Sequence, residues 1–352
     1  MPSWLWEATE SRWRRGLLSP LLVAEGLYRV GARVHRLGYV TGALRSHRVP
    51  LRVVSIGNLT VGGSAKTPVT AWLARELRAR GRKVAVLSRG VGGSRIRSVN
   101  VVSDGSRILV GTAEVGDEPV LLAKAARGVP VLAGRNRTAL ALRARALFGT
   151  EVALLDDGFQ HYRLARDVDL VCLDAAFGLG NRHVLPRGPL REPPRALRRA
   201  HAILWTRAPQ GFSAPPTPPG GGSGPQWVVP IEASGLRDLA SGRSEPLAHL
   251  SGAEVGLLAA VARPDRIVRS LEQLGARVVT RRFFRDHHLY GKENVAGLDS
   301  GVTWVTTEKD AVKIPARWLQ GRSLLVLEEE VRPADAPRLV QWLLERLDSS
   351  RS

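Results

Sequence analysis

The residues best suited to chemistry stand in a glycine-rich stretch at 53–67. A β-branched and apolar run leads into a turn with Gly62 and Gly63, and Lys66 and Thr67 then open a helical pattern. A strand, turn and helix in this order direct backbone N–H groups and a helix N-terminus at an anion. Lys66 would reach the β- and γ-phosphates of a nucleotide, and the Thr67 hydroxyl would hold Mg²⁺.

This stretch matches the phosphate-loop consensus G-x-x-x-x-G-K-[ST] only in part. Thr60 and Ala65 stand where the consensus has glycine, which is favoured there because the loop uses positive φ and close backbone approach. A glycine-rich turn that happens to precede Lys-Thr is the plainer interpretation. The candidate nucleotide-binding residues are Thr60, Val61, Gly62, Gly63, Ser64, Ala65, Lys66 and Thr67.

A second signal is the apolar run 152–155, which ends in the adjacent carboxylates Asp156 and Asp157. In phosphoryl-transfer folds such an acidic strand reaches Mg²⁺ directly or through water. A pair of aspartates at a strand end can also simply cap the next element. Beside the upstream Lys-Thr loop, coordination of Mg·ATP is the better interpretation, with Thr67, Asp156 and Asp157 as candidate metal-binding residues.

Two further candidates are arginines in loops. Arg89 follows the strand expected at 83–87, and ligands of open α/β sheets bind outside the carboxyl ends of strands. Arg191 lies in a proline-rich loop at 185–194, whose prolines fix its shape. Guanidinium groups suit phosphate, although an arginine in a glycine loop is more often only solvated.

Acid–base chemistry is suggested by two distant segments. Asp117 and Glu118 begin a helical pattern, where carboxylates often only cap the helix. Asp286, His287 and His288 have no matching His or Cys cluster that would complete a metal site. A histidine oriented by a carboxylate is the sharper interpretation.

The elements expected around these residues alternate between strands and helices. Strands at 83–87, 129–133, 152–157, 169–174 and 202–206 predict an α/β fold, a P-loop NTPase-like and mostly parallel sheet with flanking helices. Residues 208–225 are rich in Pro, Gly and Ser, which predicts a flexible linker. The expected units are an amphipathic helical segment at 1–39, a phosphate-loop kinase core at 40–207, the linker, and a smaller C-terminal α/β domain at 226–352 that contributes His287.

The first segment, 3–39, has apolar residues at helical spacing, with tryptophans and arginines ahead of them. This pattern suits a helix in the membrane interface and equally an amphipathic helix docked on the core. The uncharged run 16–24 is far shorter than the ~20 residues of a spanning helix. We expect no cleavable signal.

The composition limits the classes of molecule that the protein is expected to bind. The 352 residues carry a formal charge of +20, which favours anionic partners. No segment interleaves aromatic and basic residues as a single-strand binding surface would, so we expect no nucleic-acid partner. The single Cys172 rules out an internal disulfide and favours a reducing compartment.

Six segments in order resemble the tetraacyldisaccharide 4′-kinase family of lipid A synthesis, and the likeness extends from the Trp/Arg helix to 306–313. The resemblance implies transfer of the ATP γ-phosphate, with Mg²⁺, to the 4′-hydroxyl of tetraacyldisaccharide 1-phosphate. The product is lipid IVA, formed at the cytoplasmic face of the bacterial inner membrane by a peripheral enzyme whose N-terminal helix touches the bilayer. The segments are 56–68, 88–90, 116–119, 156–161, 185–193 and 286–288.

The resemblance also implies roles for single residues. Asp117 matches the base that accepts the hydroxyl proton, His287 matches its orienting partner, and Asp156 and Asp157 match the metal-side pair. Because His287 lies beyond the linker, we expect the two regions to close together during turnover. Positions matched near the substrates are Asn58, Arg89, Glu118, Gln160, His161, Arg191 and Glu192.

The chain departs from the family pattern at two positions. The family usually has glycine at Ala65, and Ala65 would add strain of ~1–3 kcal/mol if the loop needs positive φ there. The family usually has tyrosine at Val91, so a stacking contact is expected to be missing.

Three other classes stay open at this stage. A partition-type ATPase would share the loop and the acidic strand but would need no lipid acceptor and no segment 286–288. A nucleic-acid-binding protein would use the charge but lacks a reading motif. A soluble sugar kinase would not need residues 1–39.

Overall fold

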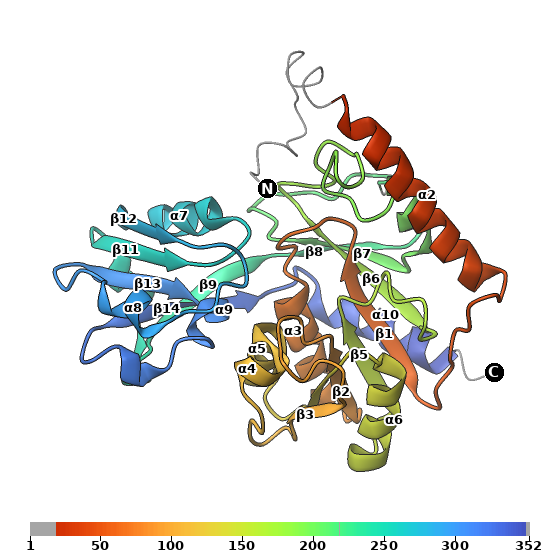
Figure 1. Ribbon diagram of the computed structural model, residues 1–352, viewed down its shortest axis with the longest axis horizontal. Coiled ribbons are helices and arrows are strands. Elements are labelled where there is room, and N and C mark those ends of the chain that lie inside the picture. The colour runs from red at the N-terminus through yellow and green to blue at the C-terminus, as the bar shows by residue number, and fades with distance from the viewer. Residues whose placement is uncertain (1–18, 218, 350–352) are drawn as a thin grey trace.

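The computed structural model describes residues 19–217 and 219–349, which form two sheets placed side by side (Figure 1). The first has eight strands in the order β3-β4-β2-β5-β1-β6-β7-β8, and the second has six in the order β10-β9-β14-β13-β11-β12. The predicted α/β class with a mostly parallel sheet is confirmed.

The first sheet is parallel except for its edge pair, β3 and β4. Its central strands are buried along their length and rich in Val, Ile and Leu, as expected of parallel strands covered by helices on both faces. The strands are β1 (Arg52–Asn58), β2 (Val84–Ser88), β3 (Asn100–Ser103), β4 (Val131–Ala133), β5 (Val152–Asp156), β6 (Val168–Asp174), β7 (Ala202–Thr206) and β8 (Gln226–Val229). The helices packed around it are α3 (Lys66–Ala79), α4 (Thr112–Val115), α5 (Asp117–Ala125), α6 (Arg137–Phe148) and α10 (Ala336–Ser349).

The second sheet joins parallel strands to an antiparallel edge formed by β9 and β10. Its own core includes Leu257, Leu271 and Val305. Its strands are β9 (Ile231–Asp238), β10 (Ser244–Glu245), β11 (Glu254–Ala259), β12 (Arg277–Phe283), β13 (Thr303–Thr307) and β14 (Leu324–Val331). Its helices are α7 (Pro264–Gln273), α8 (Lys292–Ala296) and α9 (Glu308–Ala311).

The chain crosses between the sheets after residue 229, later than the Pro/Gly/Ser-rich stretch. The strand β8 follows that stretch but pairs with β7 in the first sheet. The closing helix α10 also returns there, with Leu343 in the core of the first sheet. Within 208–225, the Pro215 carbonyl accepts a hydrogen bond of 2.6 Å from Gln226, so this stretch packs beside the first sheet. Two segments of the expected C-terminal unit therefore belong structurally to the first sheet.

The helix α2 (Leu21–Val40) lies along one side of the first sheet (Figure 1). The residues expected ahead of it, including Trp4 and Trp13, lie outside the described residues. Among the described residues, no helix is long and apolar enough to cross a membrane.

Candidate active site

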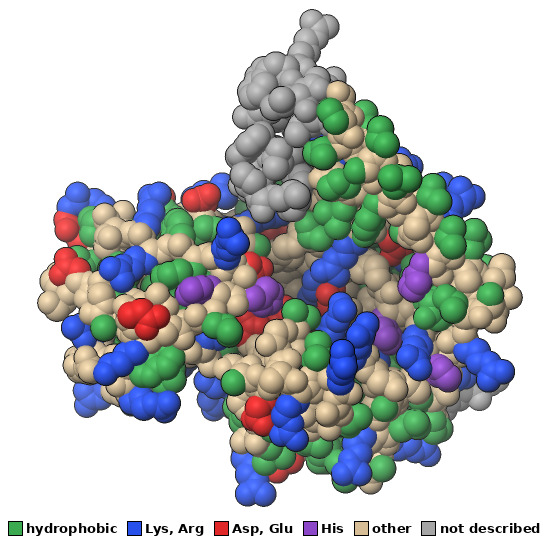
Figure 2. Space-filling model, viewed as in Figure 1, with side chains coloured by type: hydrophobic (Ala, Val, Ile, Leu, Met, Phe, Trp, Pro, Cys, Tyr) green, Lys and Arg blue, Asp and Glu red, His purple; other side chains and the backbone are tan. Residues whose placement is uncertain are grey.

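A cavity of about 1660 Å³ lies between the two sheets and takes side chains from both. Its walls include the phosphate loop from the first sheet and Asp286, His287 and Lys309 from the second. Figure 2 shows histidine and acidic side chains gathered at this hollow. The site is thus shared between the two sheets.

The phosphate loop runs from the end of β1 to the start of α3. Ala65 precedes α3 with φ 56° and ψ 27°, in the left-handed region. The expectation that this position needs a positive φ is confirmed. A non-glycine residue in this conformation costs about 1–2 kcal/mol, so the loop carries the strain that the sequence suggested.

The other departure from the loop consensus has a simple structural explanation. Thr60 forms an isolated antiparallel bridge with Leu190, and the neighbouring Val61 N–H donates to the Pro189 carbonyl at 2.7 Å. A residue in a β-bridge is extended, so position 60 does not need the conformational freedom of glycine. The bridge also ties the phosphate loop to the proline-rich loop that carries Arg191.

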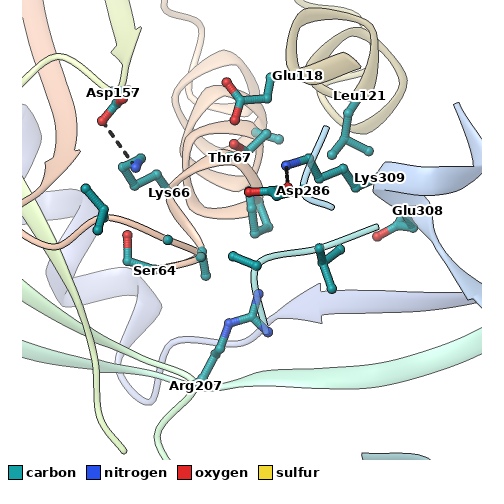
Figure 3. A pocket seen from close by; sticks show the side chains of 18 of the residues that line it. Ser64, Lys66, Thr67, Glu118, Leu121, Asp157, Arg207, Asp286, Glu308 and Lys309 are labelled. Carbon is teal, nitrogen blue, oxygen red and sulfur yellow. Dashed lines mark hydrogen bonds and ion pairs between the residues drawn. The ribbon is translucent and has the colours of Figure 1, made fainter. Parts of the chain in front are cut away.

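Lys66 points from the loop toward the end of β5 (Figure 3). Its Nζ lies 3.2 Å from Oδ1 of Asp157. The same carboxylate binds Nη1 of Arg191 at 2.8 and 2.9 Å. Burial would raise the pKa of Asp157, but Lys66 and Arg191 outweigh it and hold that pKa well below the usual range. Asp157 is therefore ionised and shared by two cations.

Asp156 has a different environment, although it is the next residue. It is 2% exposed, and its two oxygens accept hydrogen bonds from Thr70 at 3.2 Å and Thr67 at 3.4 Å. Burial, with the charge of Glu118, raises its pKa against the opposing charge of Lys66. An added cation beside Asp156 would favour its ionised form.

The donor set fits Mg²⁺. This ion prefers oxygen ligands, and in nucleotide sites it takes one or two from the protein with the rest from water and phosphate. The hydroxyl of Thr67 and the carboxylate of Asp156 are already within hydrogen-bond distance of each other. Among the described residues, no three His, Cys, Asp or Glu side chains group as a metal cage.

Asp117, from a helix of the first sheet, contacts His287, from a loop of the second sheet. Asp117 is the first residue of α5, and His287 follows β12 in a loop where its φ is 61°. The Nδ1 of His287 lies 3.1 Å from each carboxylate oxygen of Asp117. The contact that the sequence led us to expect on closure is present in this structure.

The electrostatic setting shifts the pKa values of Asp117 and His287 in opposite directions. Burial raises the pKa of Asp117, but the hydrogen bond from His287 and the charges of Lys309 and Lys313 outweigh it, so the pKa is lowered. The hydrogen bond to Asp117 raises the pKa of His287 against burial and the charge of Lys309. An ionised carboxylate only accepts hydrogen bonds, so Nδ1 of His287 carries a hydrogen and its N–H donates a hydrogen bond to Asp117.

Comparison with known proteins decides the family. Residues 17–348 match the family described as tetraacyldisaccharide-1-P 4′-kinase. The chain belongs to this family. It is 45% identical over 319 residues to the tetraacyldisaccharide 4′-kinase of Anaeromyxobacter sp. strain Fw109-5, which covers 86% of this chain and 84% of the relative. It is 40% identical over 329 residues to that of Syntrophus aciditrophicus strain SB, covering 88% of each chain.

A solved structure agrees with the sequence comparison. LpxK from Aquifex aeolicus, in complex with ATP, superposes with a TM-score of 0.78 at 29% identity, covering 94% of this chain and 99% of that one. The family resemblance read from the sequence is confirmed, and the membership favours a tetraacyldisaccharide 4′-kinase over the ATPase, the nucleic-acid-binding protein and the soluble sugar kinase.

The remaining residues expected near the substrates of this kinase family divide into two groups. The side chains of Arg89, Glu118, Gln160, Arg191 and Glu192 line the cavity.

The second group, Asn58 and His161, is absent from the lining. Asn58 is buried and donates to the Thr60 carbonyl at 2.5 Å, so it supports the loop. Burial and surrounding arginines lower the pKa of His161 to about 4, and its buried Nε2 has no hydrogen-bond partner.

Sequence reasoning assigned no role to several residues that line the cavity. Lys309 binds Oδ1 of Asp286 at 2.7 Å (Figure 3). Its Nζ also lies 3.5 Å from Nε2 of His287. It belongs to segment 306–313, which carried part of the family resemblance, and its charges directly after an apolar strand were the available signal. Tyr28 of α2 donates to the Arg191 carbonyl at 3.1 Å, for which the sequence had no signal.

Proposed function

We propose that this chain is an ATP-dependent lipid kinase that phosphorylates the 4′-hydroxyl of tetraacyldisaccharide 1-phosphate and so forms lipid IVA. The names of the family and of its curated relatives support the reaction. The ATP complex of the Aquifex aeolicus neighbour supports the phosphate donor.

One geometric observation carries the proposal. The phosphate loop and His287 line the same cavity, and His287 is bound to a buried carboxylate. Phosphoryl transfer needs a held γ-phosphate and an aligned hydroxyl more than it needs covalent chemistry from the protein. The cavity provides cations on the side of the first sheet and a proton acceptor where the two sheets meet.

The donor side of the reaction rests on Lys66. ATP offers phosphate oxygens to Lys66 in place of its partner Asp157, and the loop amides before α3 offer hydrogen-bond donors. The hydroxyl oxygen attacks the γ-phosphorus, the bond from that phosphorus to the bridging oxygen breaks, and ADP leaves. Mg²⁺, held by Thr67 and Asp156, supplies positive charge for the phosphate oxygens when bound.

The acceptor side rests on Asp117 and His287 acting together. Asp117 is 5% exposed and is not among the lining residues, whereas His287 is 38% exposed and faces the cavity. The pair therefore meets the hydroxyl through the imidazole, and the charge of Asp117 makes the pair basic. The burial of Asp117 supports this shared role over a carboxylate that acts alone.

The membrane partner is proposed from α2. One face of the helix is exposed and strongly apolar, which suits insertion into the headgroup region of a bilayer. The other face contacts the site through Tyr28, so bound lipid would lie close to the reaction centre. We place the enzyme at the cytoplasmic face of the inner membrane as a peripheral protein. The exposed apolar residues are Leu22, Val23, Leu27, Val30, Val34, Leu37 and Val40.

The reaction is tested by transfer of radiolabel from γ-labelled ATP to tetraacyldisaccharide 1-phosphate, with and without Mg²⁺. Lys66→Met, Asp117→Asn and His287→Gln should each lower kcat/KM by about 10²-fold or more. Near-wild-type turnover in both Asp117→Asn and His287→Gln would show that this pair is not the proton acceptor. If the label is transferred only to water, the protein hydrolyses ATP and the proposed lipid kinase activity is wrong.

A further inference from the structure

Lys313 carries a buried ammonium group close to the acceptor pair. Its side chain is 3% exposed, and its Nζ lies 2.8 Å from Oδ1 of Asp310 and 3.9 Å from Oδ2 of Asp117. The Tyr290 ring is on another side, with its centre 5.1 Å from Nζ. A charge taken out of water needs compensating partners, and two carboxylates fill that role here.

Asp310 is fixed independently of Lys313. It is fully buried, and its Oδ2 accepts hydrogen bonds from the Ala260 N–H at 3.1 Å and the Thr307 hydroxyl at 2.8 Å. Its other oxygen is left to Lys313. The ammonium of Lys313 is therefore paired with one carboxylate that two further hydrogen bonds hold, and Asp117 is the second carboxylate near it.

The charges around Asp117 come from three segments. Its own helix adds Glu118, whose N–H donates to Oδ1 of Asp117 at 3.0 Å. Without the ammonium of Lys313, Asp117 and Asp310 would share a buried site as like charges, which favours a proton on one of them. Asp310 already accepts two hydrogen bonds, so the Asp117–His287 pair would take up the proton more readily. The other titratable groups that act on Asp117 are His287 and Lys309. Asp286 contacts His287, and Tyr290 contacts Lys313.

We propose that Lys313 is a positioning residue for the reaction: its ammonium joins Asp310 to Asp117 and holds Asp117 ionised and turned toward His287. The inference rests on the proposed function of the Asp117–His287 pair. It also gives segment 306–313 a role, because Lys313 belongs to the second sheet and Asp117 to the first.

Lys309 has a different role, although it stands only four residues earlier in the chain. It is 21% exposed, binds Asp286 at 2.7 Å and approaches His287 from the Nε2 side. Lys313 instead approaches Asp117, with its Nζ 3.9 Å from Oδ2. The two lysines therefore flank the pair from opposite ends, and only Lys313 bridges two buried carboxylates.

The test is the pH dependence of kcat/KM in the full chain with Lys313→Met. Loss of the ammonium should move the acid limb to higher pH by about one unit or more, while KM for ATP changes little. In the pH range between the acid limb of the mutant and that of wild type, the ratio of mutant to wild-type kcat/KM should fall about tenfold for each unit by which the pH is lowered. Lys313→Arg should restore much of the wild-type limb. The matched control is Lys292→Met, which removes an exposed lysine of α8 and should leave the profile unchanged.

Asp310→Asn provides a second variant with the opposite sign. In this variant the Asp310 carboxylate is gone, so the ammonium of Lys313 is paired with Asp117 alone. The acid limb of the kcat/KM profile should therefore move to lower pH. A purely structural role for the Lys313–Asp310 pair would lower activity equally at all pH values. If Lys313→Met and Asp310→Asn fold and the acid limbs of their kcat/KM profiles stay where they are in wild type, the inference is wrong.

A measurement without substrate separates this inference from the proposed function. The imidazole resonance of His287, assigned by its loss in His287→Gln, should titrate at higher pH in Lys313→Met because a nearby positive charge is gone. If wild type shows no lipid kinase activity but this titration moves, the proposed function fails and the placement of Lys313 stands. An unmoved titration in folded Lys313→Met overturns the placement.

Discussion

Lys66 and Asp157 form an ion pair of 3.2 Å between the phosphate loop and the end of β5. Asp157 also binds Arg191, so one carboxylate holds two cations that suit phosphate. A nucleotide must compete with Asp157 for Lys66. The carboxylate therefore acts as an internal stand-in for phosphate in this structure.

The first prediction follows from that competition. In the absence of Mg²⁺, Asp157→Asn should bind ATP about threefold to tenfold more tightly than wild type, because both cations are released. Isothermal titration calorimetry measures the affinity. Lys66→Met is the matched comparison and should bind more weakly. If Asp157 instead serves chiefly to hold the metal, the substitution will leave Mg²⁺-free affinity unchanged and weaken only Mg²⁺-dependent binding.

A second prediction concerns the strained position of the loop. Ala65→Gly should raise the free energy of unfolding by about 0.5–1 kcal/mol, since glycine adopts positive φ without the steric cost that alanine pays. Urea denaturation measures this difference. Ala71→Gly, in the interior of α3, is the control and should lower stability by about 1 kcal/mol. Equal losses in both variants would show that Ala65 is not strained.

Much of this arrangement could be predicted from the sequence. The strands of the first sheet are apolar runs, and Lys66, Asp156 and Asp157 follow such runs at the carboxyl edge, so local pattern was sufficient. The positive φ of Ala65 followed from the glycine expected there.

Other features depended on contacts between distant segments. The return of α10 to the first sheet follows from packing of its apolar face, and periodicity does not say against which sheet a face packs. The contacts of Asp157 with Arg191 and of Asp117 with Lys313 could not be read from the sequence either, because these segments meet only after the chain has folded.

The pH dependence of stability provides a third prediction. Asp117 has a lowered pKa, so it stabilises the fold above its unfolded-state pKa and loses this as the pH falls through the folded value. His287 has a raised pKa, so its contribution is complete below its unfolded-state pKa and is lost as the pH rises through the folded value. The pair therefore stabilises most between the ordinary pKa values of an aspartate and a histidine.

Urea denaturation at about pH 5.5 and about pH 8.5, on either side of the ordinary histidine pKa, checks the third prediction. Wild type should lose more stability than His287→Gln between the two conditions. His249→Gln is a control on an exposed histidine that is far along the chain from the pair. The same pH slope in wild type and His287→Gln would contradict the raised pKa.

The fourth prediction concerns how α2 is held on the site. Glu25 is the buried charge of this helix, at 4% exposure, and its Oε2 lies 2.8 Å from Nδ1 of His183. Its Oε1 accepts from the Val184 N–H at 3.3 Å. Glu25→Ala should therefore lower the free energy of unfolding of this region by about 1–3 kcal/mol, because buried partners are left unsatisfied.

Hydrogen exchange followed by mass spectrometry locates that effect. Amides of α2 and of the loop after His183 should exchange faster in Glu25→Ala, and turnover should fall because Tyr28 no longer holds the Arg191 carbonyl in place. Arg33→Ala, at an exposed position of the same helix, is the control and should leave exchange in the loop unchanged. Faster exchange confined to α2, with the loop and turnover unaffected, would show that the helix is anchored without influencing the site.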